Sequence, residues 1–395
     1  MSDFSMETKL VHAGERRTQP IGQPVATPLY ATATYTYDSM VEMEAVFTGE
    51  GGDYVYSRYG NPTVAALEDA LCEIEAGTVS VAYSSGMAAI HAALMACELA
   101  PGSVVLASQD LYGASFDLLN KIFGSFGVKM KTADFNALEE LQSKTAEFKP
   151  RVLLAETISN PLLKICDIEK VAEIAHANGA RLIVDNTFAS PYLCQPLTLG
   201  ADFTVHSATK YLSGHADAMG GIVVSGDEFD RNTLVGVLKL VGGVLSVWEA
   251  HQILRGVKTL ALRMEKQCSN AQILAETLAR NERVERVYYP NLSGDKELTK
   301  KVLRGDFGGA LVSIRLKDDT TEAAWRFMDA LKLCVRATSL GDVYTLVSHS
   351  ASSSHRELSP KKRADLGITD GLVRISVGIE DVKDIIADIE QALKK

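Results

Sequence analysis

The spacing of apolar residues becomes helix-like near residue 61. Asn61 is a suitable N-cap and Pro62 fits a first helical turn, and apolar residues then recur every three or four positions until Gly77. This pattern predicts an amphipathic helix that begins near Pro62 and ends before Gly77. The residues on its apolar face are Val64, Leu67, Leu71 and Ile74.

Beyond this helix, short apolar runs alternate with longer helix-like segments. The runs have the length and composition of buried strands, and the segments between them carry one apolar face each. Such alternation favours a mostly parallel sheet covered by helices on both sides, with binding groups at the carboxyl ends of the strands. The predicted strands span residues 79–83, 103–108, 151–156 and 181–185, and the predicted helices span 86–98 and the region around 168–175.

The pattern changes after a glycine-rich segment at residues 236–243. A long helical region from Val247 to about residue 281 is followed by strand-like runs, one further helix and a final helix, which is typical of a smaller α+β domain. We therefore expect an arm over residues 1–57, a large domain over 58–245 and a C-terminal domain over 246–395. The strand-like runs of the last region are 284–289, 309–314 and 372–377, and its first short helix lies near 323–331.

Composition excludes several classes of protein. The 395 residues are 46% hydrophobic and 23% charged, which is globular rather than disordered, and a net charge of -10 without a basic cluster argues against nucleic acid as a partner. The most apolar stretch, 88–107, is interrupted by polar residues, which argues against a membrane span. The polar first fifteen residues argue against a signal peptide, and six dispersed cysteines without a CxxC pair favour a reducing cytoplasm.

Three segments of the large domain carry candidate chemistry. Tyr83-Ser-Ser-Gly-Met-Ala-Ala89 joins a strand to a helix and can offer backbone N–H groups to a phosphate; Asp185 ends a strand; and Lys210 lies among small and apolar residues. Each has a simpler explanation, namely a tight turn, a capping carboxylate and a lysine that reaches the surface. Together they match the needs of pyridoxal phosphate, which are a phosphate anchor, an acid for the ring nitrogen and an amine for a Schiff base.

Seven motifs carry a resemblance over nearly the whole chain. They resemble the Cys/Met-metabolism family of pyridoxal-phosphate enzymes, whose fold is the aspartate-aminotransferase-like fold type I, an α/β fold with a mostly parallel seven-stranded sheet and a smaller α+β C-terminal domain. The motifs are Tyr56-Ser-Arg-Tyr-Gly-Asn-Pro-Thr63, Ser84-Ser-Gly-Met87, Asp110-Leu-Tyr-Gly113, Val184-Asp-Asn-Thr187, Ser207-Ala-Thr-Lys210, Leu254-Arg-Gly-Val-Lys-Thr-Leu260 and Val373-Arg-Ile-Ser-Val-Gly-Ile379.

The resemblance implies how the cofactor would be held. Lys210 would form the Schiff base, Asp185 would pair with the ring nitrogen, and Tyr112 would stack on the ring and protonate the leaving group. Asn160 would contact the ring oxygen. The residues that the resemblance assigns to the phosphate are Gly86, Met87, Ser207 and Thr209, together with Tyr56 and Arg58 of a neighbouring subunit.

It also implies a substrate site and an assembly. Arg374 would grip the α-carboxylate of an amino acid, since a guanidinium matches two carboxylate oxygens, and Ser339 would position Lys210 and the substrate. A site shared through Tyr56 and Arg58 implies a homodimer, within a tetramer. The reaction implied is loss of the γ substituent from a sulfur amino acid, followed by release of a 2-oxo acid and ammonia or by capture of a thiol.

Three positions bear on the substrate. Thr338 stands where members that handle cystathionine typically carry glutamate, which favours methionine γ-lyase chemistry over the alternatives: cystathionine γ-lyase, cystathionine γ-synthase and O-acylhomoserine sulfhydrylase. Ala114, where many methionine γ-lyases have cysteine, and Tyr344, where glutamate is common, depart from the family pattern. The preferred leaving group and the balance of elimination and replacement stay open.

The same sequence argues against several other functions. His206, His215 and Asp217 could suggest a metal site, but neither HExxH nor a cysteine pair accompanies them, so no metal is expected. The absence of GxSxG argues against an α/β-hydrolase, and the absence of GxGxxG before a helix argues against a dehydrogenase. A non-catalytic binding protein of the same fold remains a remote alternative.

Overall fold

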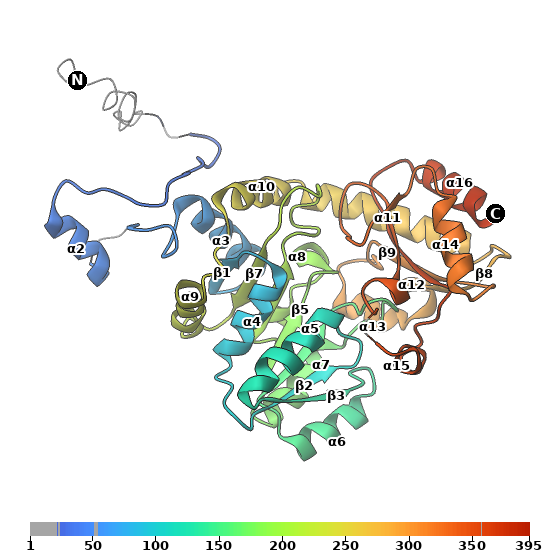
Figure 1. Ribbon diagram of the computed structural model, residues 1–395, viewed down its shortest axis with the longest axis horizontal. Coiled ribbons are helices and arrows are strands. Elements are labelled where there is room, and N and C mark those ends of the chain that lie inside the picture. Colours follow the sequence, from blue (N-terminus) through green and yellow to red (C-terminus); the bar gives the residue numbers. More distant parts are fainter. Residues whose placement is uncertain (1–21, 23, 51–53, 357) are drawn as a thin grey trace.

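The computed structural model describes residue 22 and residues 24–50, 54–356 and 358–395. Figure 1 shows an extended arm on one side, a central body built around the larger sheet, and the strands of a second sheet with their helices on the other side. Among the described residues, no helix combines the length and the apolar character needed to cross a membrane.

The larger sheet contains seven strands in the order β1-β7-β6-β5-β4-β2-β3. The neighbouring pairs among β2 to β6 are parallel, while β7 runs antiparallel to both β1 and β6. The predicted mostly parallel seven-stranded sheet is therefore confirmed. Its strands are β1 (Val79–Tyr83), β2 (Val104–Ser108), β3 (Lys129–Ala133), β4 (Val152–Glu156), β5 (Arg181–Asp185), β6 (Phe203–Ser207) and β7 (Gly221–Ser225).

Helices cover both faces of this sheet. The predicted helix at residue 62 is confirmed as α3, and the Asn61 side chain caps it by accepting a hydrogen bond from the Thr63 N–H. The helices up to residue 245 are α2 (Met40–Thr48), α3 (Pro62–Ile74), α4 (Gly86–Ala96), α5 (Gly113–Asp117), α6 (Leu138–Phe148), α7 (Ile168–Ala177), α8 (Ser190–Leu193) and α9 (Asp230–Val241). A π turn (Leu118–Ile122) and 3-10 turns (Phe123–Phe126 and Pro196–Leu199) complete this region.

Two apolar layers hold the sheet between the helices. Successive residues of a strand point to opposite faces, and accordingly Leu153 belongs to one buried cluster while Val152 and Leu154 belong to the other. Strand β5 divides in the same way, with Leu182 in the first cluster and Ile183 in the second. Because both faces are buried, these strands read as continuous apolar runs rather than alternating ones. The edge strand β3 is mostly polar, which explains why the apolar pattern did not indicate it.

The C-terminal region forms a second sheet of five strands in the order β10-β11-β12-β9-β8. The expected smaller α+β unit is present there. Its strands are β8 (Val284–Tyr288), β9 (Leu311–Leu316), β10 (Val335–Arg336), β11 (Leu346–His349) and β12 (Leu372–Ser376). Its helices are α10 (Val247–Val257), α11 (Leu260–Leu278), α12 (Pro290–Ser293), α13 (Lys296–Val302), α14 (Thr321–Asp329), α15 (Pro360–Asp365) and α16 (Val382–Leu393), with a 3-10 turn at Ser350–Ser352.

The predicted long helix from Val247 to about residue 281 is two helices. The break between α10 and α11 follows Gly256, where an added Cβ would lie only 2.2 Å from the carbonyl oxygen of Ser213. Arg263 of α11 donates a 2.8 Å hydrogen bond to the Gly256 carbonyl and so satisfies a free helix end. Because the helix-like spacing of apolar residues continues across this break, the sequence pattern did not indicate the break. Helix α10 follows the predicted domain boundary at residue 246 but packs on α3, which precedes that boundary. The boundary therefore stays a prediction.

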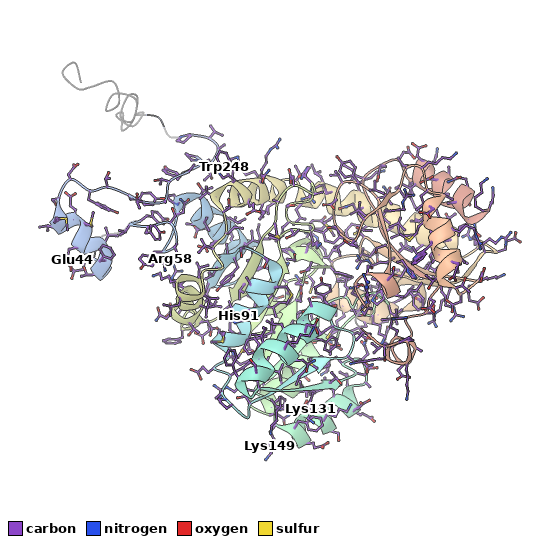
Figure 2. All side chains as sticks on the ribbon, viewed as in Figure 1. Glu44, Arg58, His91, Lys131, Lys149 and Trp248 are labelled. Atoms are coloured by element: carbon purple, nitrogen blue, oxygen red, sulfur yellow. The ribbon has the colours of Figure 1, made fainter. Side chains whose placement is uncertain are left out.

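The described part of the arm, which includes helix α2, extends away from the two sheets (Figure 1). Helix α2 contains no buried residue and lies away from the sheets (Figure 1), and Figure 2 places Glu44 of α2 far from the rest of the chain. Several large apolar side chains of the arm are exposed: Val25, Tyr30, Met40, Val41 and Phe47. Part of the predicted arm, residues 1–21, 23 and 51–53, lies outside the described residues.

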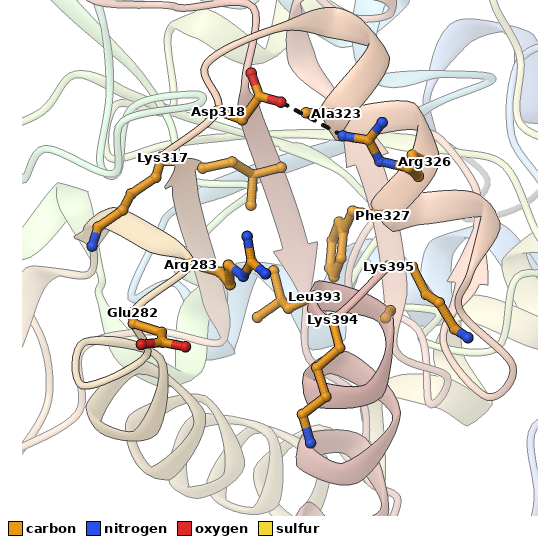
Figure 3. Close-up of a pocket in the computed structure, with 12 residues that line it drawn as sticks. Glu282, Arg283, Lys317, Asp318, Ala323, Arg326, Phe327, Leu393, Lys394 and Lys395 are labelled. Atoms are coloured by element: carbon orange, nitrogen blue, oxygen red, sulfur yellow. Dashed lines mark ion pairs between the residues drawn. The ribbon is translucent and has the colours of Figure 1, made fainter.

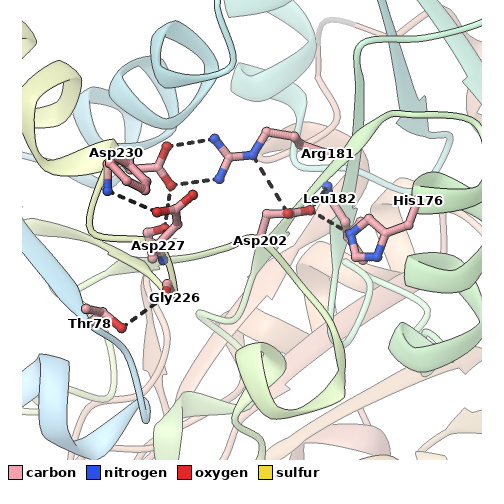
Figure 4. Close-up of polar contacts among 10 residues, drawn as sticks. Thr78, His176, Arg181, Leu182, Asp202, Gly226, Asp227 and Asp230 are labelled. Atoms are coloured by element: carbon pink, nitrogen blue, oxygen red, sulfur yellow. Dashed lines mark hydrogen bonds and ion pairs between the residues drawn. The ribbon is translucent and has the colours of Figure 1, made fainter.

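A charged network ties the amino-terminal ends of the large sheet to a helix. Figure 4 shows Arg181, the first residue of β5, between two carboxylates. Its guanidinium donates two 2.7 Å hydrogen bonds to Asp230 at the start of α9, and its Nε lies 3.8 Å from Asp202. Asp202 in turn contacts His176 of α7 at 3.0 Å. A two-pronged pair of this kind is among the stronger polar contacts in proteins.

We predict that Arg181→Leu destabilises the fold. The change leaves the nearly buried Asp230 carboxylate without its cation, which we expect to lower the free energy of unfolding by about 2 kcal/mol, below the full value for a buried pair because Arg181 is partly exposed. Urea unfolding followed by circular dichroism measures it. Lys170→Met, which breaks an exposed pair with Glu173, is the matched control and should change stability by less than about 0.5 kcal/mol. Equal effects of the two variants would contradict the prediction.

Candidate active site

One cavity of about 280 Å³ lies at the carboxyl-terminal ends of the strands of the large sheet. The strands β4, β5 and β6 deliver side chains to it directly, and β12 of the smaller sheet delivers one more. Parallel strands align their carboxyl ends along one edge, so residues distant in the sequence meet there. The lining residues that the sequence had indicated are Gly86, Met87, Tyr112, Asn160, Asp185, Ser207, Thr209, Lys210, Thr338 and Arg374.

The amino-terminal end of α4 forms one wall of this cavity. Ser85 caps the helix by accepting a hydrogen bond from the Ala88 N–H. The first N–H groups of any helix lack partners within the helix, so this end suits an anionic ligand. An added Cβ at Gly86 would lie 2.8 Å from the Ser207 Cβ, and one at Gly221 would lie 2.1 Å from the Ser85 oxygen. Only glycine therefore allows α4, β6 and β7 to approach this closely.

Lys210 lies in the turn that follows β6. Its Nζ is 3.0 Å from the Ser339 hydroxyl and forms no ion pair among the described residues. Burial lowers the pKa of its ammonium, and the nearby Arg374 cation lowers it further, while Asp342 acts in the opposite direction. A lysine of this kind has a larger fraction of free amine and is a better nucleophile than an exposed one.

Asp185 ends β5 on the same edge. Its Oδ1 accepts hydrogen bonds from the backbone N–H and the hydroxyl of Thr187, at 3.0 and 2.5 Å. Burial raises the pKa of Asp185, whereas the two Thr187 donors favour the ionised form. The carboxylate is thus oriented by its own chain two residues later, which leaves the second oxygen available to a ligand.

Arg374 reaches the cavity from the middle of β12. Its side chain donates 2.9 Å to the Asn160 Oδ1 and 3.3 Å to the Ser339 carbonyl, and its Nε is buried without a hydrogen-bond partner among the described residues. Burial lowers its pKa to about 10. A guanidinium that is buried without a carboxylate partner suits an anionic ligand.

Tyr112 stands at the mouth of the cavity, just before α5, with 42% of its surface exposed. Its backbone N–H donates a 2.7 Å hydrogen bond to Glu156 at the end of β4. The sequence indicated the 151–156 strand but did not assign Glu156 to the site. A polar residue that ends a buried strand was the available signal, and the same signal had been used for Asp185.

Several predicted positions lie elsewhere in the chain. Tyr56 and Arg58 do not line the cavity; Arg58 lies over the ring of Tyr59 and donates a hydrogen bond to the Lys239 carbonyl of α9. Ser339 is not part of the lining but bonds to both Lys210 and Arg374. The residues that line the cavity and that the sequence reasoning did not assign are Ser85, Ile90, Glu156, Ile158, Thr187, Phe188, Met219, Leu340 and Ser354.

A different hollow of about 450 Å³ lies in the C-terminal region beside α14 and α16 (Figure 3). Its lining combines lysine and arginine side chains, two acids and several apolar residues, and Figure 3 shows Arg326 paired with Asp318. None of the catalytic candidates reaches it. As for metals, the described residues contain no group of three or more His, Cys, Asp or Glu placed to hold an ion, and His206 instead contacts the buried Glu75.

The cavity fits pyridoxal phosphate on its own geometry. The glycine-lined helix end suits a phosphate, the oriented Asp185 suits a basic ring nitrogen, the Lys210 amine suits an aldehyde and the Tyr112 ring suits a flat heterocycle. Arg374 remains for a carboxylate. The site thus contains a separate group for each part of that cofactor and one more for an amino acid.

Comparison with known proteins agrees with this geometry. A family model described as Cys/Met metabolism PLP-dependent enzyme matches residues 7–394. L-methionine gamma-lyase of Pseudomonas putida is 43% identical over 98% of this chain and 96% of that protein, and cystathionine beta-lyase of Lactococcus lactis subsp. cremoris is 38% identical over 99% of each. A solved cystathionine gamma synthase from Xanthomonas oryzae pv. oryzae in complex with cystathionine has a TM-score of 0.87, 36% identity and coverage of 94% and 93%.

These matches extend over the whole body of the chain and agree with the expected fold type I. Lys210, Asp185 and the start of α4 meet in one cavity. The chain therefore belongs to the family of Cys/Met metabolism PLP-dependent enzymes, and its cofactor is pyridoxal phosphate.

Proposed function

We propose that this protein is a methionine γ-lyase, which converts methionine and water into 2-oxobutanoate, ammonia and methanethiol. The observation that carries the proposal is that Lys210, Asp185 and Arg374 meet in one cavity, although two sheets supply them. The choice of methionine is supported by the full-length relative from Pseudomonas putida, whose name is L-methionine gamma-lyase.

In this proposal the chain holds the cofactor by complementary charge and shape. The first turn of α4, with Ser207 and Thr209, binds the phosphate, and Asp185 keeps the ring nitrogen protonated because a nearby anion favours the cationic form. Tyr112 would cover the ring and Asn160 would contact the ring oxygen, since both residues line the cavity. When bound, pyridoxal phosphate supplies an electron-accepting ring that stabilises negative charge developed on the substrate.

The same residues then act on the substrate. Arg374 binds the α-carboxylate through its fork of N–H groups, which fixes the amino acid with its Cα toward Lys210. The Lys210 amine takes the proton from Cα, and Ser339, 3.0 Å away, orients that amine. Loss of a proton at Cβ and expulsion of the γ substituent follow, and the Tyr112 hydroxyl delivers a proton to the leaving sulfur.

The wall near Thr338 supports a substrate with an uncharged side chain. Thr338 lines the cavity and offers no carboxylate to a distal ammonium group, which cystathionine carries and methionine lacks. The second candidate is cleavage or synthesis of cystathionine, since the relative from Lactococcus lactis is named cystathionine beta-lyase and the similar solved structure is a cystathionine gamma synthase. Replacement on an O-acylhomoserine uses the same groups and ends with capture of a thiol.

We also propose that two copies of the chain complete each other's sites, within a tetramer. The exposed apolar side chains of the arm need a cover, and Leu240 of α9 and Trp248 of α10 are exposed as well. Tyr56 and Arg58 lie outside their own chain's cavity, and in this proposal they contact a neighbour's phosphate site, for which Arg58 exchanges the Lys239 carbonyl for the phosphate. A soluble amino acid is then the only other partner required.

Lys210→Ala should remove both colour and turnover. The purified protein should absorb in the near-visible through the imine between Lys210 and the cofactor, and the variant cannot form that bond. The measurement combines an absorbance spectrum with production of 2-oxobutanoate from methionine. Lys170→Ala, an exposed lysine of α7, serves as the matched control and should keep both. A wild-type protein that stays colourless after addition of the cofactor would overturn the proposed function.

Substrate choice should respond to Thr338→Glu. A carboxylate at this wall pairs with the distal ammonium of cystathionine, so we expect the ratio of kcat/KM for cystathionine to that for methionine to rise about tenfold. Thr338→Gln, equal in size but neutral, controls for volume. The assay compares methionine, cystathionine, cysteine and O-acetylhomoserine, with and without an added thiol. A wild-type enzyme that prefers cystathionine by a wide margin would contradict this assignment of Thr338.

Shared sites can be tested by mixing inactive subunits. Arg58→Ala lacks a phosphate contact and Lys210→Ala lacks the amine, but a hybrid dimer contains one intact site if the two residues come from different chains. Equimolar exchange should restore about a quarter of wild-type activity, because half of the dimers are hybrids with one working site each. Absence of activity after exchange has been verified by mass spectrometry would count against the shared site.

A further inference from the structure

Among the ionisable residues that line the cavity, Glu156 is the one to which the proposed function gives no role. It ends β4 and is paired in register with Asp185, which ends the neighbouring parallel strand β5. Both side chains line the same cavity. Neighbouring strands are about 4.8 Å apart, so two carboxyl groups lie side by side there.

The two carboxyl groups differ in their hydrogen bonds. Asp185 receives two donors from Thr187 on one oxygen. Glu156 receives the Tyr112 N–H at 2.7 Å on Oε1, whereas its Oε2 is enclosed and has no hydrogen-bond partner among the described residues. A carboxylate oxygen that is buried and unpaired is costly, but a protonated oxygen can donate instead.

The surrounding charges favour the proton on Glu156. Burial raises the pKa of this carboxyl well above its ordinary value, and the charge of Asp185 raises it further; Asp110 adds to the effect, although Lys164 neutralises much of it through a 2.8 Å ion pair. The backbone N–H of Tyr112 opposes the shift, as does that of Asn160.

A further charged group near Glu156 is the Arg374 cation, which is held by Asn160 and by backbone carbonyls rather than by Glu156. Two neighbouring carboxyl groups of this kind do not both ionise in a buried site. Asp185 accepts a hydroxyl donor in addition to a backbone N–H, both from Thr187, whereas the donors to Glu156 are the backbone N–H groups of Tyr112 and Asn160.

We propose that Glu156 is a positioning residue that stays an uncharged carboxylic acid, with Oε1 fixing the backbone of Tyr112 and Oε2 carrying the proton. This inference deepens the proposed function, because it relies on Asp185 as the partner of the ring nitrogen. Glu156 would thus serve two purposes: it fixes the backbone of Tyr112 at the start of α5, and because it is uncharged it adds no second anion beside Asp185.

The test compares Glu156→Gln and Glu156→Ala in the holoenzyme. Infrared spectroscopy of the wild type should contain a carbonyl band of a protonated carboxylic acid that Glu156→Gln removes. Glutamine and a protonated glutamic acid are both uncharged. The midpoint of the pH titration of the cofactor's visible absorbance should therefore stay within about 0.3 units of the wild type in Glu156→Gln. Asp185→Asn, which does remove an anion, is the positive control for that titration and should move it.

The Tyr112 anchor has its own readout. Glutamine keeps an oxygen that accepts the Tyr112 N–H, whereas alanine does not, so the visible circular dichroism of the bound cofactor should persist in Glu156→Gln and fall in Glu156→Ala. We expect kcat/KM to be about tenfold lower in Glu156→Ala than in Glu156→Gln, the value of one lost hydrogen bond. If Glu156→Ala does not fold, the infrared band and the titration of Glu156→Gln decide alone.

Three results would overturn the inference: an unchanged infrared spectrum in Glu156→Gln, a fall of the visible midpoint by about one unit or more, which is expected if a charged neighbour is lost, or equal dichroism in the two variants. The spectroscopic readouts need no substrate. Failure of methionine turnover therefore tests the proposed function, and these spectra test Glu156 separately.

Discussion

Burial of two cations in one cavity is the constraint around which the site is built. The described residues place no carboxylate against either Lys210 or Arg374; instead Lys210 contacts the Ser339 hydroxyl, and Arg374 contacts an amide and carbonyl oxygens. Desolvation lowers the pKa of both groups. Burying two basic groups without carboxylate partners lowers the stability of the protein in the absence of ligands. The arrangement suits a cofactor aldehyde, which can bond to the lysine, and a substrate carboxylate, which can pair with the arginine.

In the large sheet, a stabilising ion pair and a candidate catalytic group lie at opposite ends of the same strand. At the amino ends, Arg181 is fully paired and joins β5 to α9, as ordinary structural ion pairs do. At the carboxyl end of the same strand, Asp185 is held by Thr187 on one oxygen only. Polar groups are therefore satisfied internally at one end and kept available to a ligand at the other, which is the arrangement expected of a binding edge in an α/β protein.

Close backbone approach provides the rest of the site. Gly86 and Gly221 allow the start of α4 to lie directly against β6 and β7, so the helix end and the lysine turn face the same small cavity. The smaller sheet then closes it by presenting Arg374 from β12. Neither region contains the whole set, which makes the relative placement of the two sheets as important to function as any single residue.

The sequence by itself determined several of the helices and strands and the chemical parts of the candidate site. Asn61, Pro62 and an apolar face predicted helix α3. The buried strands could be predicted because a strand covered on both faces, such as 152–156, is a continuous apolar run. Motifs around Lys210 and Asp185 indicated the cofactor. These signals are local, since caps, periodicity and short motifs depend on residues a few positions apart.

Only the tertiary structure decided what those parts touch. The break between α10 and α11 arises where Gly256 meets the backbone of Ser213, a contact between segments about forty residues apart that apolar spacing cannot register. The role of Glu156 depends on strand register beside Asp185 and on the Tyr112 N–H, which no motif records. Residues on neighbouring strands come close because segments that are distant in the sequence pair in the folded chain. The local sequence pattern does not record this pairing, so it cannot show which side chains lie within hydrogen-bonding distance.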